Sequence, residues 1–166
     1  MRGTMSPAVP STVSRRSLLT GIVLVGALTG CTSGGDEAAG RAAAASSRGL
    51  RRRVARDSTA LLARYDATVS AHPSLAGALT PFREVVTAHV TALDEPGEAT
   101  TGVAGAAPEV PARQDRAIAA LVEAERRAAD ERLAALADAP PELARLLASL
   151  AAAGEVQAHL LNEVRP

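Results

Sequence analysis

The chain has 166 residues, and its 18 basic side chains balance 18 acidic ones, so the formal net charge is zero. This balance excludes the strong positive field with which many proteins recruit nucleic acid. The chain has no tryptophan, and Tyr65 and Phe82 are its only aromatic residues. It therefore lacks the stacking surfaces of most single-strand binders. The length allows one domain with a small core of alanine, leucine and valine.

The first recognisable segment is an apolar run from Leu18 to Leu28, which directly follows Arg15, Arg16 and Ser17. The run has 11 residues, whereas a helix needs about 20 residues to cross a bilayer. A charged start, a short apolar run and small residues at its end are typical of a signal peptide. The stretch SRRSLL resembles the twin-arginine export signal, and a general secretory signal is the alternative. We predict a signal peptide over residues 1–30.

The run ends at Cys31, the only cysteine in the chain. The stretch from Leu28 to Cys31, LTGC, resembles the bacterial lipobox, in which the thiol receives a diacylglyceryl group and the cysteine becomes the first mature residue. An unmodified cysteine in an ordinary signal peptide is the alternative. Two acyl chains hold a protein stably, at about 0.8 kcal/mol per buried methylene. We predict lipidation of Cys31 at the extracytoplasmic face of the cell membrane, and no other cofactor.

Residues 31–48 are predicted to be the lipidated N-terminus followed by a disordered tether, because this segment contains no large apolar residue. From Gly49 onwards apolar residues recur at helical spacing, and no strand pattern competes. This spacing predicts four helices, over residues 49–71, 80–94, 112–138 and 141–164. Thr80 and Pro81 are expected to begin the second helix as its N-cap and first-turn proline.

The connection from Glu95 to Pro111 has 17 residues, which is long for a loop inside a compact domain. Fully extended it would reach about 50 Å, more than the rise of about 22 Å of the predicted second helix. The break at Ala139, by contrast, is short and predicts a tight antiparallel hairpin of the last two helices. One long crossover between helices 2 and 3 predicts an all-α, ferritin-like four-helix bundle over residues 49–166.

Two stretches carry a resemblance to a known family: ARYDATVSAHPSLAGALTPFREVVTAHV, residues 63–90, and DAPPELARLLASLAAAGEVQAHLL, residues 138–161. Together with the anchor and the four alanine-rich helices, they resemble actinobacterial lipoproteins with a ferritin-like domain. The resemblance covers most of residues 50–164. It implies the fold, and it implies no function because the family has no assigned activity.

A ferritin-like di-iron site needs two Glu-x-x-His motifs and two further glutamates that face the interior. This sequence departs from that pattern, because Glu84 and His89 are five residues apart and Glu155 and His159 are four apart. Glu155 and His159 also fall away from the leucine stripe of their helix. A di-iron centre is therefore not predicted.

Each predicted helix nevertheless carries one polar residue inside or beside its apolar face: Asp57, His89, Glu125 and Gln157. Because a buried carboxylate is costly unless paired, we expect these residues to form a buried polar layer. One interpretation is that the layer binds a metal ion or a proton-linked ligand, with His89 and Glu125 as the candidate metal ligands. The other is that these residues form an ordinary buried hydrogen-bonded pair, or lie at a looser interface than the helical wheel suggests.

No phosphate-binding glycine loop, nucleophile elbow or cysteine ligand set occurs in the sequence. We therefore predict no catalytic residues. The predicted function is that of a membrane-anchored lipoprotein acting as a binding or structural module of the cell envelope. Its predicted partners are the lipid bilayer and a protein, or a second copy of the chain, but no nucleic acid. The alternative is a ferritin-like metal-binding protein or metal-dependent oxidoreductase.

Overall fold

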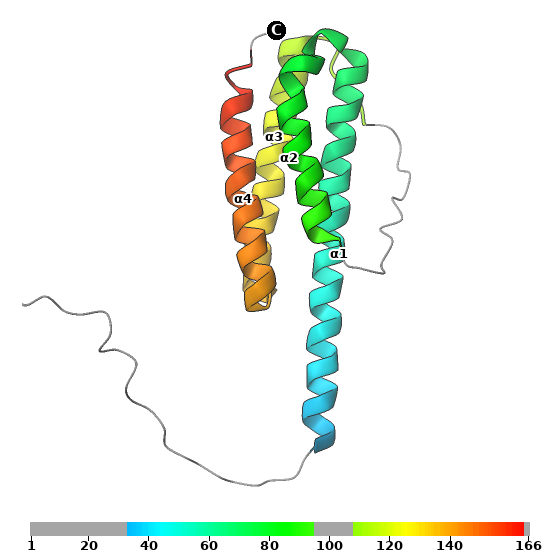
Figure 1. Cartoon of the computed structure of the whole chain (residues 1–166), viewed down its shortest axis with the longest axis vertical. Coiled ribbons are helices and arrows are strands. Elements are labelled where there is room, and N and C mark those ends of the chain that lie inside the picture. Colours follow the sequence, from blue (N-terminus) through cyan, green and yellow to red (C-terminus); the bar gives the residue numbers. More distant parts are fainter. Residues whose placement is uncertain (1–32, 95–107, 165–166) are drawn as a thin grey trace, which may run out of the picture. The chain divides into compact units, whose positions relative to one another are not determined.

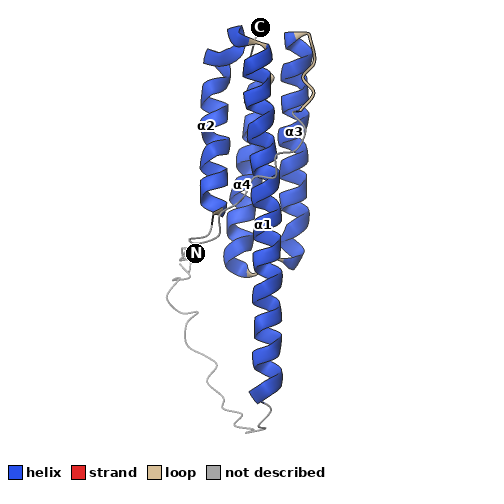
Figure 2. Ribbon diagram, turned by 90° about the vertical axis from the view of Figure 1, so that its right-hand side faces the viewer, coloured by secondary structure: helices blue, strands red, loops and turns tan. Residues whose placement is uncertain are grey.

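The computed structural model describes residues 33–94 and 108–164, and every regular element among them is helical (Figure 1). The elements in chain order are α1 (Ser33–Ala71), the 3₁₀ turn η1 (Pro73–Leu75), α2 (Ala76–Leu93), α3 (Gln114–Ala134), the 3₁₀ turn η2 (Ala135–Asp138) and α4 (Pro141–Leu161). No strand occurs in the described ranges (Figure 2). The predicted all-α fold with four helices is confirmed.

Buried hydrophobic side chains form two clusters, and the order in which each helix enters them shows the direction of that helix. The first cluster comprises Leu61, Tyr65, Leu75, Leu79, Val86, Ile118, Leu121, Val122, Ala158 and Leu161. The second cluster comprises Leu50, Val54, Ala55, Leu93, Leu143, Leu147 and Leu150. Helices α1 and α4 enter the second cluster with their earlier residues and the first with their later ones, whereas α2 does the reverse. In Figure 1, α1 and α4 accordingly run upward, and α2 and α3 run downward.

The last two helices form the tight antiparallel hairpin that the sequence predicted. Turn η2 ends at Asp138, and Pro141 occupies the first turn of α4, where its missing N–H is not needed. Small residues bring α3 and α4 together, since a Cβ on Gly154 would lie 3.4 Å from the Cβ of Ala129. The hairpin is therefore built on close packing of backbone against backbone.

The start of α1 differs from the prediction, because the helix begins at Ser33 and not near Gly49. Side chains from Gly35 to residue 46 are exposed, so the segment does lack a buried face, but the predicted disorder of the tether was wrong. Alanine has the highest helix propensity of all residues and needs no burial to favour a helix. An i,i+4 ion pair of 3.7 Å between Glu37 and Arg41 adds to this local preference.

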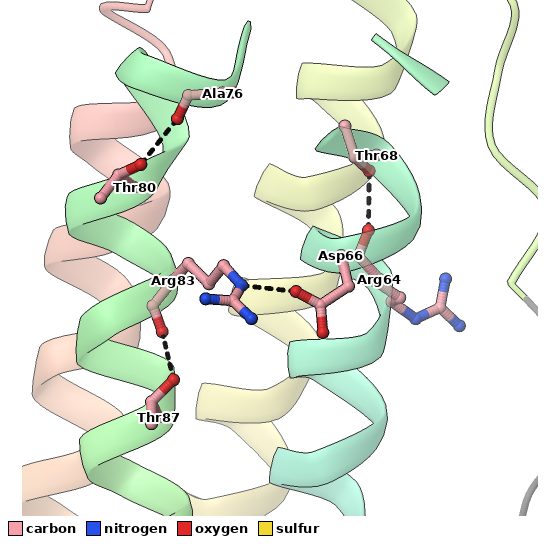
Figure 3. Close-up of polar contacts among 7 residues, drawn as sticks. All are labelled: Arg64, Asp66, Thr68, Ala76, Thr80, Arg83 and Thr87. Atoms are coloured by element: carbon pink, nitrogen blue, oxygen red, sulfur yellow. Dashed lines mark hydrogen bonds and ion pairs between the residues drawn. The ribbon is translucent and has the colours of Figure 1, made fainter. Parts of the chain in front are cut away.

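The start of α2 also differs, because this helix begins at Ala76 and not at Thr80. The hydroxyl of Thr80 donates to the backbone oxygen of Ala76 at 2.8 Å, one turn earlier, and caps no helix end (Figure 3). Pro81 lies inside the helix and not in its first turn. The 3₁₀ turn that begins at Pro73 leads directly into α2, so the chain is already helical before it reaches Thr80.

Residues 1–32, 95–107 and 165–166 lie outside the described residues. The predicted signal peptide, with Arg15 and Arg16, the lipidation site Cys31 and most of the predicted crossover therefore lie outside them too. None of the described helices combines the length and the apolar character that a membrane crossing requires.

Candidate functional site

Buried polar side chains lie between and beside the two hydrophobic clusters, and all four helices contribute to them. We call this set the polar layer; it comprises Ser58 and Tyr65 of α1, His89 of α2, Glu125 and Arg132 of α3, and Gln157 of α4. None of these residues is more than 6% exposed. On α1, for example, Ser58 lies between Ala55 of the second cluster and Leu61 of the first. The layer therefore crosses the interior of the bundle.

Glu125 is the hydrogen-bonding centre of the layer. Its Oε1 accepts bonds from the hydroxyl of Tyr65 at 2.7 Å and from Nε2 of Gln157 at 3.0 Å. Burial raises the pKa of Glu125, although the Tyr65 bond and the charge of Arg132 act in the opposite direction. Oε2 has no hydrogen-bond partner. Oε2 is therefore the oxygen that is free to carry the proton whenever the carboxyl is neutral.

Arg132 places a guanidinium group in the same interior, where the residue is only 2% exposed. It donates one bond to the backbone oxygen of Leu150 at 3.0 Å and one to the hydroxyl of Ser58 at 3.2 Å. Burial lowers the pKa of Arg132, and the charges of Glu125, Asp57 and Glu131 oppose that effect. In the described part of the chain no carboxylate forms an ion pair with this guanidinium, although the group ties α3 to both α1 and α4.

His89 is the contribution of α2, and it is 6% exposed. Burial and, to a smaller extent, the nearby charge of Arg132 together lower the pKa of His89 to about 4. Its Nδ1 has no hydrogen-bond partner. The imidazole is therefore neutral at physiological pH, and no hydrogen bond joins it to Glu125.

Three of the four residues that were expected in the layer are buried there, namely His89, Glu125 and Gln157. Asp57 is not, because its side chain is exposed on α1. The helical spacing placed Asp57 beside the apolar stripe, and the adjacent Ser58 turns inward in its place. The carboxylate of Asp57 still acts on the layer from outside, through its attraction to the charge of Arg132.

Other ionisable residues of the predicted helices lie on the surface. Glu84, Glu155 and His159 are exposed, in agreement with the expectation that Glu155 and His159 face solvent. Asp66 of α1 accepts a hydrogen bond from Nε of Arg83 of α2, and Figure 3 shows this ion pair bridging the two helices. These side chains are not available to complete a metal site in the interior.

Sequence reasoning missed Tyr65 and Arg132 as members of the layer. The spacing of both residues indicates a buried position. Arg132 follows Glu125 by seven residues, which is two helical turns along the same face, and Tyr65 follows Leu61 by four residues, which is about one turn. Arginine and tyrosine have long stems that normally carry their polar ends to water. Their polar ends here remain inside because the layer supplies hydrogen-bond acceptors.

A metal site would need more ligands than the layer offers. Among the residues that the structure describes, no group of three histidine, cysteine, aspartate or glutamate side chains could hold a metal ion. His89 and Glu125 each keep one atom without a hydrogen-bond partner, but both feel the positive charge of Arg132. A cation between them would be repelled by that guanidinium.

Comparisons with protein-family models, with curated proteins and with solved structures found no match for this chain. A functional argument therefore depends on the geometry itself. Two features distinguish this bundle from a purely apolar one: a buried guanidinium with no ion pair, and a buried carboxyl with one oxygen that accepts no hydrogen bond, both judged among the residues that the structure describes.

The hydroxyl of Tyr65 is expected to stabilise the fold, so Tyr65→Phe should lower the free energy of unfolding by about 1–2 kcal/mol. The substitution preserves the ring and removes only the donor to Glu125. Urea denaturation followed by circular dichroism measures the effect. Thr87→Ala removes an exposed hydroxyl that bonds the backbone oxygen of Arg83 and should change the stability by less than about 0.5 kcal/mol. Equal effects of the two substitutions would contradict the role of Tyr65.

Proposed function

We propose that this chain is a lipoprotein anchored by diacylglycerol on Cys31 at the extracytoplasmic face of the cell membrane. Its ferritin-like four-helix domain acts as a binding or structural module of the cell envelope. The export signal around Arg15 and Arg16 and the lipobox sequence that ends at Cys31 support the location. The arrangement of the polar layer supports the role.

One observation carries the choice of a binding module over a metal enzyme. Oε1 of Glu125 accepts hydrogen bonds from Tyr65 and Gln157 and is therefore engaged by other helices. The carboxyl is thus used to join α3 to α1 and α4. A carboxyl that is hydrogen-bonded to two other helices through one oxygen fixes how those helices pack, and this role requires no metal.

The helix directions support a ferritin-like topology. Helices α2 and α3 run in the same direction (Figure 1), as expected when one crossover joins the second and third helices. Helix α2 has 18 residues and rises by about 27 Å. An extended connection of the length available here spans that distance. One crossover between the second and third helices produces this order.

The exposed beginning of α1 supports a module that is held away from its anchor. Helix α1 starts at Ser33, two residues after Cys31. The stretch from Ser33 to Gly49, with no buried side chain among those described, rises by about 24 Å. A helix of this kind acts as a spacer that a flexible tether would not provide.

An apolar groove between α2 and α4 supports a protein partner or a second copy. It has a volume of about 470 Å³, and Phe82, Val85, Val156 and Leu160 are among the residues that line it. Val85, Val156 and Leu160 are 38%, 57% and 48% exposed. Grouped exposed apolar residues of this kind are typical of interaction surfaces.

The alternative function is that of a metal-binding protein or metal-dependent oxidoreductase of ferritin-like type. One observation favours it: Nδ1 of His89 and Oε2 of Glu125 are buried without hydrogen-bond partners. Elemental analysis of the purified chain separates the two functions. Stoichiometric iron, zinc or manganese that is lost in the variant His89→Gln would favour the metal protein.

The variant Cys31→Ser tests the proposed location. It should lose the diacylglyceryl group and the cleavage that depends on it, because serine offers no thiol. Mass spectrometry of the N-terminus and fractionation of the membranes measure both effects, and Thr32→Ser is the matched control. If the chain of natural sequence carries no lipid on Cys31, the proposed anchor is wrong.

A further inference from the structure

A cavity of about 460 Å³ lies where α1 passes the end of α3 and turn η2. Its volume falls within the range of about 300–1,000 Å³ that small-molecule sites occupy. Leu50 and Val54 of α1, together with Ala135 of η2, give it an apolar side. The cavity lies beside the second hydrophobic cluster, to which Leu50 and Val54 also belong.

The remaining wall of the cavity carries charges of both signs. Arg53 and Asp57 come from α1, Glu131 and Arg132 from α3, and Asp138 from η2. Arg53 and the three acidic residues are exposed, and no ion pair joins any of these five residues to another within the described ranges. The charges are therefore open to a ligand that offers partners of both signs.

Arg132 gives this cavity a preorganised recognition group. Its guanidinium is fixed by bonds to the backbone oxygen of Leu150 and the hydroxyl of Ser58. A guanidinium has five N–H donors, so donors remain after these two bonds. The carboxylates of Glu125, Asp57 and Glu131 attract this charge without forming an ion pair with it in the described ranges, and a ligand carboxylate at the cavity wall would supply a direct partner.

We propose that this cavity binds a small aliphatic zwitterion of the size of an amino acid or a dipeptide. The carboxylate of the ligand lies toward Arg132 and Arg53, and its ammonium group lies toward Asp57, Glu131 and Asp138. Its aliphatic side chain lies against the apolar side of the cavity. A simple anion would meet three carboxylates, and a simple cation would meet the guanidinium of Arg132. Only a ligand with both charges satisfies the whole wall.

This inference rests on the proposed function as a binding module and names its ligand class. The two can fail separately, because the state of Cys31 is determined by mass spectrometry and ligand binding by calorimetry. A chain that binds the zwitterion without a lipid on Cys31 would refute the anchor and leave the cavity assignment intact. A lipidated chain that binds no zwitterion would refute only the cavity assignment.

Isothermal titration calorimetry on the full chain, purified in detergent, tests the proposal with two zwitterions, L-leucine and L-alanyl-L-leucine. The matched controls are isocaproate, which lacks the amine of leucine, and isopentylamine, which lacks its carboxylate. At least one zwitterion should bind about tenfold more tightly than either control, as expected when a charged hydrogen bond is lost. The absence of binding by both zwitterions, or equal binding of a control, would overturn the proposal.

Variants of the exposed wall residues test the same site without disturbing the core. Arg53→Gln and Asp57→Asn should each weaken zwitterion binding by about tenfold. Glu123→Gln, which removes an exposed carboxylate elsewhere on α3 that pairs with Arg126, should leave the affinity unchanged. Circular dichroism establishes that each variant is folded. Unchanged affinity in both folded wall variants would assign the binding to another place and overturn the proposal.

Discussion

The substitution Arg132→Ala should lower the free energy of unfolding by about 3 kcal/mol. It removes the hydrogen bonds to Leu150 and Ser58, which connect α3 with α4 and α1. It also leaves a cavity, because the guanidinium is closely packed: a Cβ on Gly154 would lie 3.5 Å from Nη1 of Arg132. Urea denaturation of the purified chain measures the loss.

The variant Arg132→Met separates the two causes of that loss. Methionine fills most of the same volume with a flexible, unbranched side chain and brings no charge. Because Leu150 and Ser58 still lose their donor, Arg132→Met should lower the free energy of unfolding by about 1–2 kcal/mol, less than Arg132→Ala. A loss in Arg132→Met as large as in Arg132→Ala would show that the hydrogen bonds, and not the packing, dominate. No loss in either variant would refute a structural role for Arg132.

Acidification from pH 7 to pH 4 should destabilise the fold through His89. The pKa of His89 is about 4 in the folded chain, below its ordinary value of 6.5, because burial and Arg132 disfavour the charged imidazole. The unfolded chain therefore binds a proton first as the pH falls. The contribution of His89 to the free energy of unfolding is complete above pH 6.5 and is lost between pH 6.5 and about 4. At full burial, this shift in the pKa of His89 would change the free energy of unfolding by about 3 kcal/mol. Screening by water reduces the expected change to about 2 kcal/mol.

Glu125 acts in the opposite direction, because burial raises its pKa above the ordinary 4.5. Between pH 4.5 and the folded pKa of Glu125, the folded chain retains a proton that the unfolded chain has lost. The contribution of Glu125 to the free energy of unfolding therefore falls as the pH rises through that folded pKa.

Urea denaturation between pH 7 and pH 4 distinguishes the effects of His89 and Glu125. His89→Gln should remove most of the loss in acid, whereas Glu125→Gln should increase the net loss. The exposed control His159→Gln should behave like the natural chain, and an unchanged acid loss in His89→Gln would refute the assignment.

Much of the fold was predictable because the helices of a bundle bury one stripe each. The apolar spacing therefore yields four helices, and Pro73 and Pro141 mark two of their boundaries correctly. The exposed half of α1 escaped this reasoning because it buries nothing, and its helical form depends on local propensity. The early start of α2 escaped it because the turn that begins at Pro73 already supplies the first helical turn.

The interior site was predictable only in part. Glu125 and Gln157 interrupt apolar stripes, so their burial followed from the pattern. Their partners did not, because a hydrogen bond between residues 60 positions apart, such as that of Tyr65 and Glu125, depends on how helices face one another. No spacing within a single helix contains that information, and the same holds for the contact of Arg132 with Ser58.

The helical beginning of α1 has a geometric consequence for the faces of the helix. A helix turns by about 100° per residue, so the length of this segment determines the angle between the faces at its start and the faces that α1 buries in the bundle. Removal of seven residues would shorten this segment of α1 by about 10 Å and would return each helix face to nearly its original orientation about the helix axis. Removal of two residues would change the height little and would rotate each face by about 200°.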